Sequence, residues 1–279
     1  MATKREKGQG KGKAARQAPE ELHHGAVMTA AARIDPVLRE RSALLWADRP
    51  PSTRGPRPGL SREEVTEAAM ALAGEEGIPA VTMHAVAKRL GYTTMALYRY
   101  FPSKEALYDA IVDAGLGSPP VPEEGISWRM EVTRWSLAKR DVLIARPWLA
   151  ELPFVAAPHG PNWLAWLEAL ARPLARTGLS PSDQGQVISI IDGYTRGASD
   201  TVVSLAQARA RGITAQEWAA AVGADLGRAV GDPRFPAFAA IITAPPEAKP
   251  FTMTESFAFG LERILDGIEM YVERVRSES

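Results

Sequence analysis

The side chains with the most distinctive chemistry are hydroxyl and basic groups that lie close together between Ile78 and Lys104. This stretch contains no aspartate or glutamate, although the chain carries 33 acidic and 33 basic residues and has a formal net charge of zero. Hydroxyl groups hydrogen-bond to phosphate oxygens of DNA, and lysine and arginine neutralise their charge. The alternative is a chance cluster of charges on a solvated face. We predict a DNA-contacting surface made of Thr82, Thr93, Thr94, Met95, Tyr98, Arg99, Tyr100 and Lys104.

The expected roles within this surface differ. Thr94 and Met95 lie near the start of a short helix, where a recognition helix reaches base edges. Tyr98 and Tyr100 are expected to donate hydrogen bonds to phosphate, with core packing as the alternative. Lys104 falls in the first turn of the next helix, where free backbone N–H groups also favour a phosphate.

Short helices between residues 61 and 114 must position these side chains. Each begins after a hydroxyl residue that can accept hydrogen bonds from the first turn, and these residues are Ser61, Thr82, Thr93 and Ser103. Gly77 and Gly91 end the first two helices. The turn around Gly91, between two short helices, is typical of a helix-turn-helix.

The run Thr-Met-His-Ala-Val-Ala-Lys-Arg-Leu-Gly at 82–91 is followed by Leu-Tyr-Arg-Tyr-Phe-Pro-Ser-Lys-Glu-Ala-Leu at 97–107. Together these runs resemble the tetracycline-repressor (TetR) family, and residues 257–268 resemble the last helix of its tetracycline-repressor-like C-terminal domain. The chain departs from the usual pattern at Tyr100, often His, and at Tyr92, often Val. The resemblance implies an all-α homodimer whose C-terminal domain binds a small molecule.

Three regions are expected along the chain. Residues 1–58 form a disordered basic extension and linker, in which a short helix within 28–47 would be interrupted by Pro36 and has no assigned role. Arg54 and Arg57 lie in its part rich in proline and glycine and are expected to follow the minor groove of DNA. A three-helix DNA-binding domain with the helix-turn-helix covers 59–116, and a helical regulatory domain covers 117–279.

The regulatory domain is expected to bind a ligand and to dimerise. Helices are predicted near 126–145, 147–152, 162–177, 182–211, 214–230 and 254–276, and no segment alternates with the period of a strand. Most tryptophans of the chain lie in this domain, and a wall of aromatic side chains suits an apolar or planar ligand. Each tryptophan alone also suits an ordinary core. The candidate ligand-binding residues are Trp128, Trp135, Trp148, Trp163, Trp166, Tyr194 and Arg196.

Two long helices carry stripes that suit dimerisation through a four-helix interface. Intrachain packing of the same stripes is the alternative, but a helix-turn-helix usually needs two half-sites. The candidate interface residues are Gly193, Gly197, Phe257, Leu261, Ile264 and Ile268.

Composition excludes several classes of protein. The chain has no cysteine, and its histidines have no metal-ligand spacing, so we expect neither metal nor cofactor. No apolar run is long enough to span a membrane, and we expect a cytoplasmic protein. The sequence favours a repressor that a small apolar or aromatic effector releases from a palindromic operator in double-stranded DNA. An enzyme and an architectural or RNA-binding helical module are the alternatives, and no catalytic motif supports the first.

Overall fold

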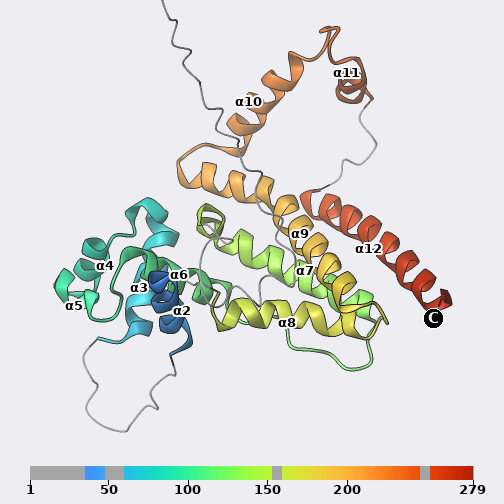
Figure 1. Cartoon of the computed structure of the whole chain (residues 1–279). Helices are drawn as coiled ribbons and strands as arrows, with labels where there is room; N and C mark the ends of the chain where they lie inside the picture. Colours follow the sequence, from blue (N-terminus) through green and yellow to red (C-terminus); the bar gives the residue numbers. More distant parts are fainter. Residues whose placement is uncertain (1–34, 48–59, 153–158, 246–251, 279) are drawn as a thin grey trace, which may run out of the picture. The chain divides into compact units, whose positions relative to one another are not determined.

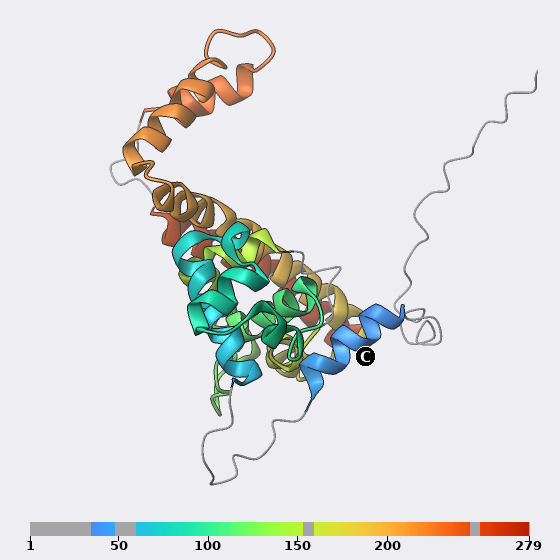
Figure 2. The same ribbon diagram turned by 90° about the vertical axis from the view of Figure 1, so that its left-hand side faces the viewer.

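The computed structural model describes residues 35–47, 60–152, 159–245 and 252–278. Within these ranges all regular structure is helical and no β-strand occurs. This confirms the all-α fold predicted from the sequence. Residues 36–279 belong to one compact unit, shown from two directions in Figures 1 and 2.

The helices of the DNA-binding region begin directly after the hydroxyl residues that were predicted to cap them. Ser61 and Glu64 form a reciprocal capping box, in which Ser61 Oγ accepts from the Glu64 N–H at 3.1 Å. Thr82, Thr93 and Ser103 accept in the same way at the next three helix starts. The helices are α3 (Arg62–Glu76), α4 (Met83–Leu90), α5 (Thr94–Tyr98) and α6 (Lys104–Leu116), with the 3-10 turn η2 (Ile78–Ala80) after α3.

An additional helix, α2 (Pro36–Trp46), precedes this group. The expectation of disorder throughout 1–58 is therefore wrong for residues 36–46. Pro36 opens the helix instead of interrupting it, because the first helical position needs no backbone N–H donor. Arg41 of α2 forms two 2.7 Å hydrogen bonds from its guanidinium to the buried Asp109 carboxylate of α6. The arginine side chain thus attaches α2 to α6.

The regulatory region is built from longer helices. The five expected helices other than 147–152 are present, with ends within three residues of the prediction. Residues 147–151 form a 3-10 turn, and one short helix was not predicted. The elements are α7 (Trp128–Ala145), η3 (Pro147–Glu151), α8 (Pro161–Ala175), α9 (Pro181–Ala210), α10 (Ala215–Gly227), α11 (Pro236–Thr243) and α12 (Met253–Glu278).

Helices α7, α8, α9 and α12 pack together, and α7 lies against α9 over much of its length (Figure 1). Val132 and Leu143 of α7 and Ile191 of α9 are buried there. By contrast, α10 and α11 contain no buried residue and project from the end of α9 in both views (Figures 1 and 2).

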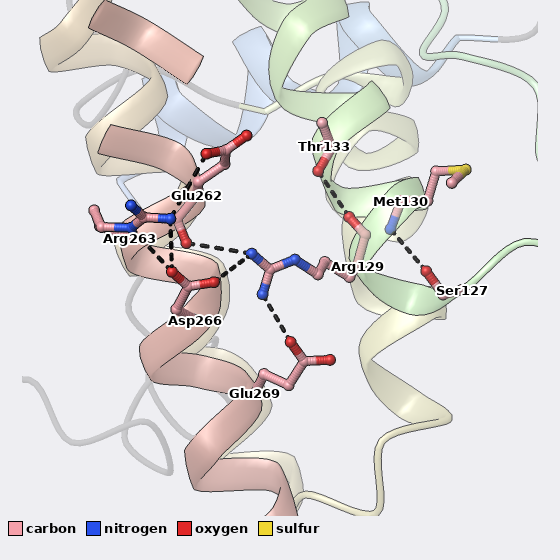
Figure 3. A network of polar contacts seen from close by, with 8 residues as sticks. All are labelled: Ser127, Arg129, Met130, Thr133, Glu262, Arg263, Asp266 and Glu269. Atoms are coloured by element: carbon pink, nitrogen blue, oxygen red, sulfur yellow. Dashed lines mark hydrogen bonds and ion pairs between the residues drawn. The ribbon is translucent and has the colours of Figure 1, made fainter. Parts of the chain in front are cut away.

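The start of α7 is tied to α12 by one arginine (Figure 3). The guanidinium of Arg129 lies 2.6 Å from an Asp266 carboxylate oxygen and 2.8 Å from a Glu269 carboxylate oxygen. It also donates to the Glu262 carbonyl at 3.4 Å. Arg129 holds the pKa of Asp266 below its usual range, chiefly through the hydrogen bond. An arginine that bridges two carboxylates of α12 in this way orients the two helices relative to each other.

A carboxylate joins α6 to α8. Gly160 occupies the N-cap position of α8 and offers no side chain to accept a hydrogen bond. Asp113 of α6 fills that role, accepting from the Trp163 N–H at 2.9 Å and the Asn162 N–H at 3.3 Å. A side chain at Gly160 would overlap the Asp113 carboxylate. The last turns of the helix that closes the DNA-binding region therefore support the start of a regulatory helix.

Candidate DNA-binding site

Helix α5 is anchored by a single core residue. Leu97 is fully buried. The preceding turn is fixed by Gly91, whose φ of 76° is left-handed and therefore favours glycine. The Tyr92 N–H donates to the Ala87 carbonyl at 3.0 Å and completes the end of α4. This arrangement leaves the opposite side of α5 open.

The open side of α5 combines apolar and hydroxyl groups. Met95 is 74% exposed and Tyr98 is 43% exposed. Thr93 and Arg99 are exposed as well, whereas Thr94 is half-buried. Single exposed apolar side chains are common, but an exposed apolar patch with a polar rim is typical of an interaction site. The structure therefore brings the predicted contact residues of α5 onto one accessible surface.

Two of the predicted DNA contacts, Thr82 and Thr93, also cap helices. Thr82 Oγ1 accepts from the Ala85 N–H at 3.1 Å, and Thr93 Oγ1 accepts from the Ala96 N–H at 3.3 Å. A hydroxyl that accepts in a cap keeps its own O–H to donate. Both threonines can thus cap a helix and hydrogen-bond to a phosphate oxygen at once.

Lys104 is positioned by a residue that sequence reasoning missed. Its ammonium nitrogen lies 4.9 Å from the centre of the Tyr108 ring, one helical turn further on. The Tyr108 hydroxyl in turn donates to the carbonyls of Ile78 and Val81 at 3.2 Å each. The spacing of four between Lys104 and Tyr108 was the available signal. Tyr100 is half-buried and packs against the core.

Not every cation of the acid-free stretch is available to phosphate. Arg89 forms a two-pronged ion pair with Glu75 of α3, with nitrogen to oxygen distances of 2.7 and 2.6 Å. The hydrogen bond from Arg89 lowers the pKa of Glu75. His84, Lys88 and Tyr92 were not among the predicted contacts, yet all three are exposed on α4 or in the turn after it. Arg54 and Arg57 lie outside the described residues.

The structure separates the predicted ligand-binding residues into several places. Trp135 and Trp166 are buried together at an angle of 77°, and the Trp135 indole donates to the Trp166 carbonyl at 2.8 Å. Trp148 is buried near Gly115, Trp163 packs on His159, and Trp128 lies at the edge of the core. They therefore do not form one continuous wall.

Tyr194 and Arg196, the last two predicted ligand residues, both make contacts within the chain. The Tyr194 hydroxyl donates to the Phe257 carbonyl at 2.7 Å, and α12 comes close there because Gly260 has no side chain. Arg196 lies 4.0 Å from Asp192, one turn earlier on α9. The two side chains form an i,i+4 ion pair.

Three of the predicted dimer contacts are in the wrong place. Phe257, Leu261 and Ile268 are buried in the core of their own subunit, and Ile264 packs against it. The apolar stripe of α12 faces α9 of the same chain, and periodicity does not distinguish an intrachain stripe from an interface. Gly193 and Gly197 have open space beside them.

The geometry defines a class. Two short helices meet at a tight turn, and the second has an open side lined with groups that suit DNA. This is a helix-turn-helix DNA-binding protein. In the described residues no helix is long and apolar enough to cross a membrane.

The chain belongs to the tetR family of bacterial regulatory proteins. Residues 65–111 match the model of that family, and residues 120–272 match the tetracyclin repressor-like C-terminal domain. Proteins of this family are transcriptional regulators and not enzymes. The chain is accordingly a DNA-binding regulator.

Two curated relatives illustrate the similarity. The chain is 32% identical over 243 residues to the HTH-type transcriptional repressor DrrR1 of Streptomyces coeruleorubidus, covering 85% of this chain and 87% of that protein. It is 30% identical over 142 residues to the tetracycline repressor protein class C of Escherichia coli, covering 50% of this chain and 64% of that protein.

Solved structures share the fold. Apo ActR from Streptomyces coelicolor matches with a TM-score of 0.59 at 21% identity, over 77% of this chain and 99% of that one. TetR from Acinetobacter baumannii AYE matches with a TM-score of 0.52 at 23% identity, over 76% of this chain and 98% of that one.

Proposed function

We propose that this protein is a dimeric, ligand-responsive repressor that binds a palindromic operator through α5 and leaves it when a small apolar or aromatic effector binds. The observation that carries the proposal is the open face of α5, where the exposed Met95 and Tyr98 are surrounded by donors to phosphate. Residues 59–116 form the DNA-binding domain in this proposal, and residues 117–279 form the regulatory domain.

The proposed docking places α5 in the major groove. Thr94 and Met95 then reach base edges, and the C5-methyl group of thymine is a suitable partner for both. Tyr98 and Lys104 contact the phosphates on either side, with Thr82, Thr93, Arg99 and Tyr100 as further backbone contacts. A contact set of this kind gives modest discrimination per base, so two half-sites are needed for a specific operator.

The second subunit is proposed to pack on the outer face of α9 and α12, which we define by Ile190, Gly193, Gly197, Gly267 and Met270. The three glycines have open space where a side chain would stand, so another backbone can approach closely. Ile190 and Met270 are exposed beside them. Gly193 and Gly197 thus remain proposed interface residues, whereas Phe257, Leu261 and Ile268 do not.

The effector is proposed to bind in the regulatory domain. A relative is named a tetracycline repressor, and a variant of TetR from Acinetobacter baumannii, with 24% identity to this chain, has been solved in complex with minocycline. These names support a small-molecule effector for this chain without identifying it. A ligand that favours one separation of the recognition helices shifts the population toward that separation.

Selection of bound fragments from genomic DNA tests this function. We expect the full chain to enrich fragments that share an inverted repeat, with half-site centres one helical turn or a multiple of it apart. Equal recovery of all fragments at moderate salt would contradict the proposal and favour an architectural DNA-binding protein.

Replacing either phosphate contact is expected to weaken binding to all DNA sequences about equally. Tyr98→Phe loses one hydrogen bond and should lower affinity about twofold to tenfold. Lys104→Ala should also reduce the slope of log affinity against log salt concentration by roughly 1. Fluorescence anisotropy on specific and random duplexes measures both effects.

The matched control is Arg228→Ala, which removes an exposed cation from the end of α10. Its affinity and salt slope should equal those of the wild type. Unchanged affinity in both Tyr98→Phe and Lys104→Ala would remove these side chains from the DNA contacts.

A further inference from the structure

A layer of polar side chains crosses the interior of the regulatory domain where α7 packs against α9. The buried stripe of α7 changes from Val132 and Trp135 to Ser136, Lys139 and Arg140 before it becomes apolar again. Helix α9 packs against α7, and its buried stripe also changes, from Ile191 to Thr195 and Ser199. Polar groups buried inside a helical bundle are costly unless each has a partner.

Several atoms of this layer have no partner among the described residues. The side-chain oxygens of Ser136 and Thr195 and the Nε of Arg140 are buried without a hydrogen bond. Ser199 satisfies its hydroxyl by donating to the Thr195 carbonyl at 2.6 Å. The unpaired atoms comprise an arginine donor and two hydroxyls, and a hydroxyl can also donate. All three unpaired groups can therefore donate a hydrogen bond to a bound molecule.

Lys139 adds a positive charge to the same layer. It is only 5% exposed, and in the described part of the chain no hydrogen bond or ion pair reaches its ammonium group. Its neighbours are aromatic: the ammonium nitrogen lies 4.9 Å from the centre of the Trp166 ring and 5.8 Å from that of Trp135. The rings partly replace water around the cation, but they do not neutralise its charge.

The surroundings of Lys139 favour loss of its proton. Burial lowers the pKa of Lys139 to about 8, with Asp192 on α9 opposing the shift and Arg196 on α9 reinforcing it. Arg140, the next residue, is held by Thr254 at 3.0 Å and lies over the Phe257 ring. Asp192 therefore only partly offsets the cost of burying the Lys139 charge, and no carboxylate forms an ion pair with it in the described part of the chain.

We propose that this layer is the anchor of the effector site and that Lys139 binds an acidic group, a carboxylate or an enolate, on an aromatic small molecule. The aromatic part of the ligand would lie against Trp135 and Trp166, and the unpaired Ser136 and Thr195 hydroxyls would donate to its oxygens. Calling the bound molecule an effector rests on the proposed function. The binding itself can be measured without DNA.

The test compares an aromatic acid with its neutral counterpart on the full chain. We expect 2-naphthoate to quench tryptophan fluorescence saturably with one site per chain, and 2-naphthalenemethanol to bind at least tenfold more weakly. Lys139→Met should reduce the 2-naphthoate affinity at least tenfold and abolish the preference for the acid. Lys139→Arg should retain most of both.

Two readouts separate an anion site from a structural role. Above pH 8 the wild type should lose 2-naphthoate affinity about tenfold per pH unit, because binding then requires proton uptake by Lys139. Lys139→Arg should lose this dependence, since arginine stays charged. Lys139→Met should melt no earlier than the wild type and bind DNA equally well, so failure of the site is distinguishable from failure of DNA binding.

Arg134→Met is the matched control, because it removes a cation from the solvent side of the same helix. Arg134 pairs with Glu123 beside a shallow surface depression. Its affinity for 2-naphthoate should equal that of the wild type. Unchanged affinity in Lys139→Met, or a loss in Arg134→Met alone, would overturn the proposal.

Discussion

Replacing Met270 with aspartate is expected to separate the proposed dimer while each subunit stays folded. Met270 is 72% exposed in the single chain, so a charge there is solvated in the monomer. In the dimer the same charge is buried without a partner, and two-fold symmetry places it in the interface twice. A cost of about 3–5 kcal/mol per uncompensated charge would raise the dimer dissociation constant by at least two orders of magnitude.

Sedimentation equilibrium measures this effect directly, and operator affinity should fall with the loss of dimer. Val121→Asp is the matched control, because Val121 is 80% exposed in the loop before α7 and lies outside the proposed face. It should remain dimeric. If Met270→Asp sediments as an intact dimer at low concentration, the subunits meet on another face.

The second large effect is a loss of stability when the contact between α6 and α8 through Asp113 is removed. Asp113→Ala removes a buried acceptor from the first turn of α8 and leaves the Asn162 and Trp163 N–H groups without it. The loss of a cap together with an unsatisfied buried donor should cost roughly 2–4 kcal/mol of unfolding free energy. For a chain of this size that corresponds to a melting temperature lower by about 3–7 °C.

The pH dependence of the Asp113 effect follows from its pKa. Burial raises the pKa of this carboxyl, and the hydrogen bonds from Trp163 and Asn162 oppose that shift. Because the pKa is raised in the folded state, Asp113 stabilises the fold most when it is protonated. Its contribution to the free energy of unfolding is complete below the unfolded pKa of about 3.9, and it declines as pH rises through the folded pKa. The stability difference between wild type and Asp113→Asn should therefore be larger at pH 4 than at pH 7. Chemical denaturation at both pH values measures it, and a difference that increases toward pH 7 would contradict this reasoning.

The contact that Asp113 makes between α6 and α8 also links the two domains of the proposed regulator. Under the proposed function, a shift of α8 on ligand binding would move α6 through this carboxylate. Arg41 of α2 binds Asp109 one turn earlier, and the Trp46 indole donates to the His159 carbonyl at 3.0 Å just before α8. α2 therefore contacts both sides of the same join.

Local sequence signals predicted the local structure well. Ser61, Thr82 and Thr93 cap helices because a hydroxyl beside free N–H groups has the same effect in any context. Gly91 ends α4 for an equally local reason. Helix α11 was missed because it is only eight residues long and Pro236 opens it.

Partners distant in sequence could not be predicted. Arg89 pairs with Glu75, which lies outside the acid-free stretch, and Asp113 caps a helix 49 residues away. The stripe that contains Leu261 has the same periodicity whether it packs on its own chain or on another. Only the fold shows which contact it makes.

The proposed function requires two copies of α5 to read one operator at a fixed separation. The most direct test compares the selected inverted repeat with the same repeat carrying five extra base pairs between its half-sites. Half a turn places the second half-site on the opposite side of the duplex, so the two recognition helices cannot both reach their grooves. We predict that affinity falls at least a hundredfold toward the non-specific level. Equal affinity for the two duplexes would contradict the claim, because a single helix-turn-helix would then suffice for recognition.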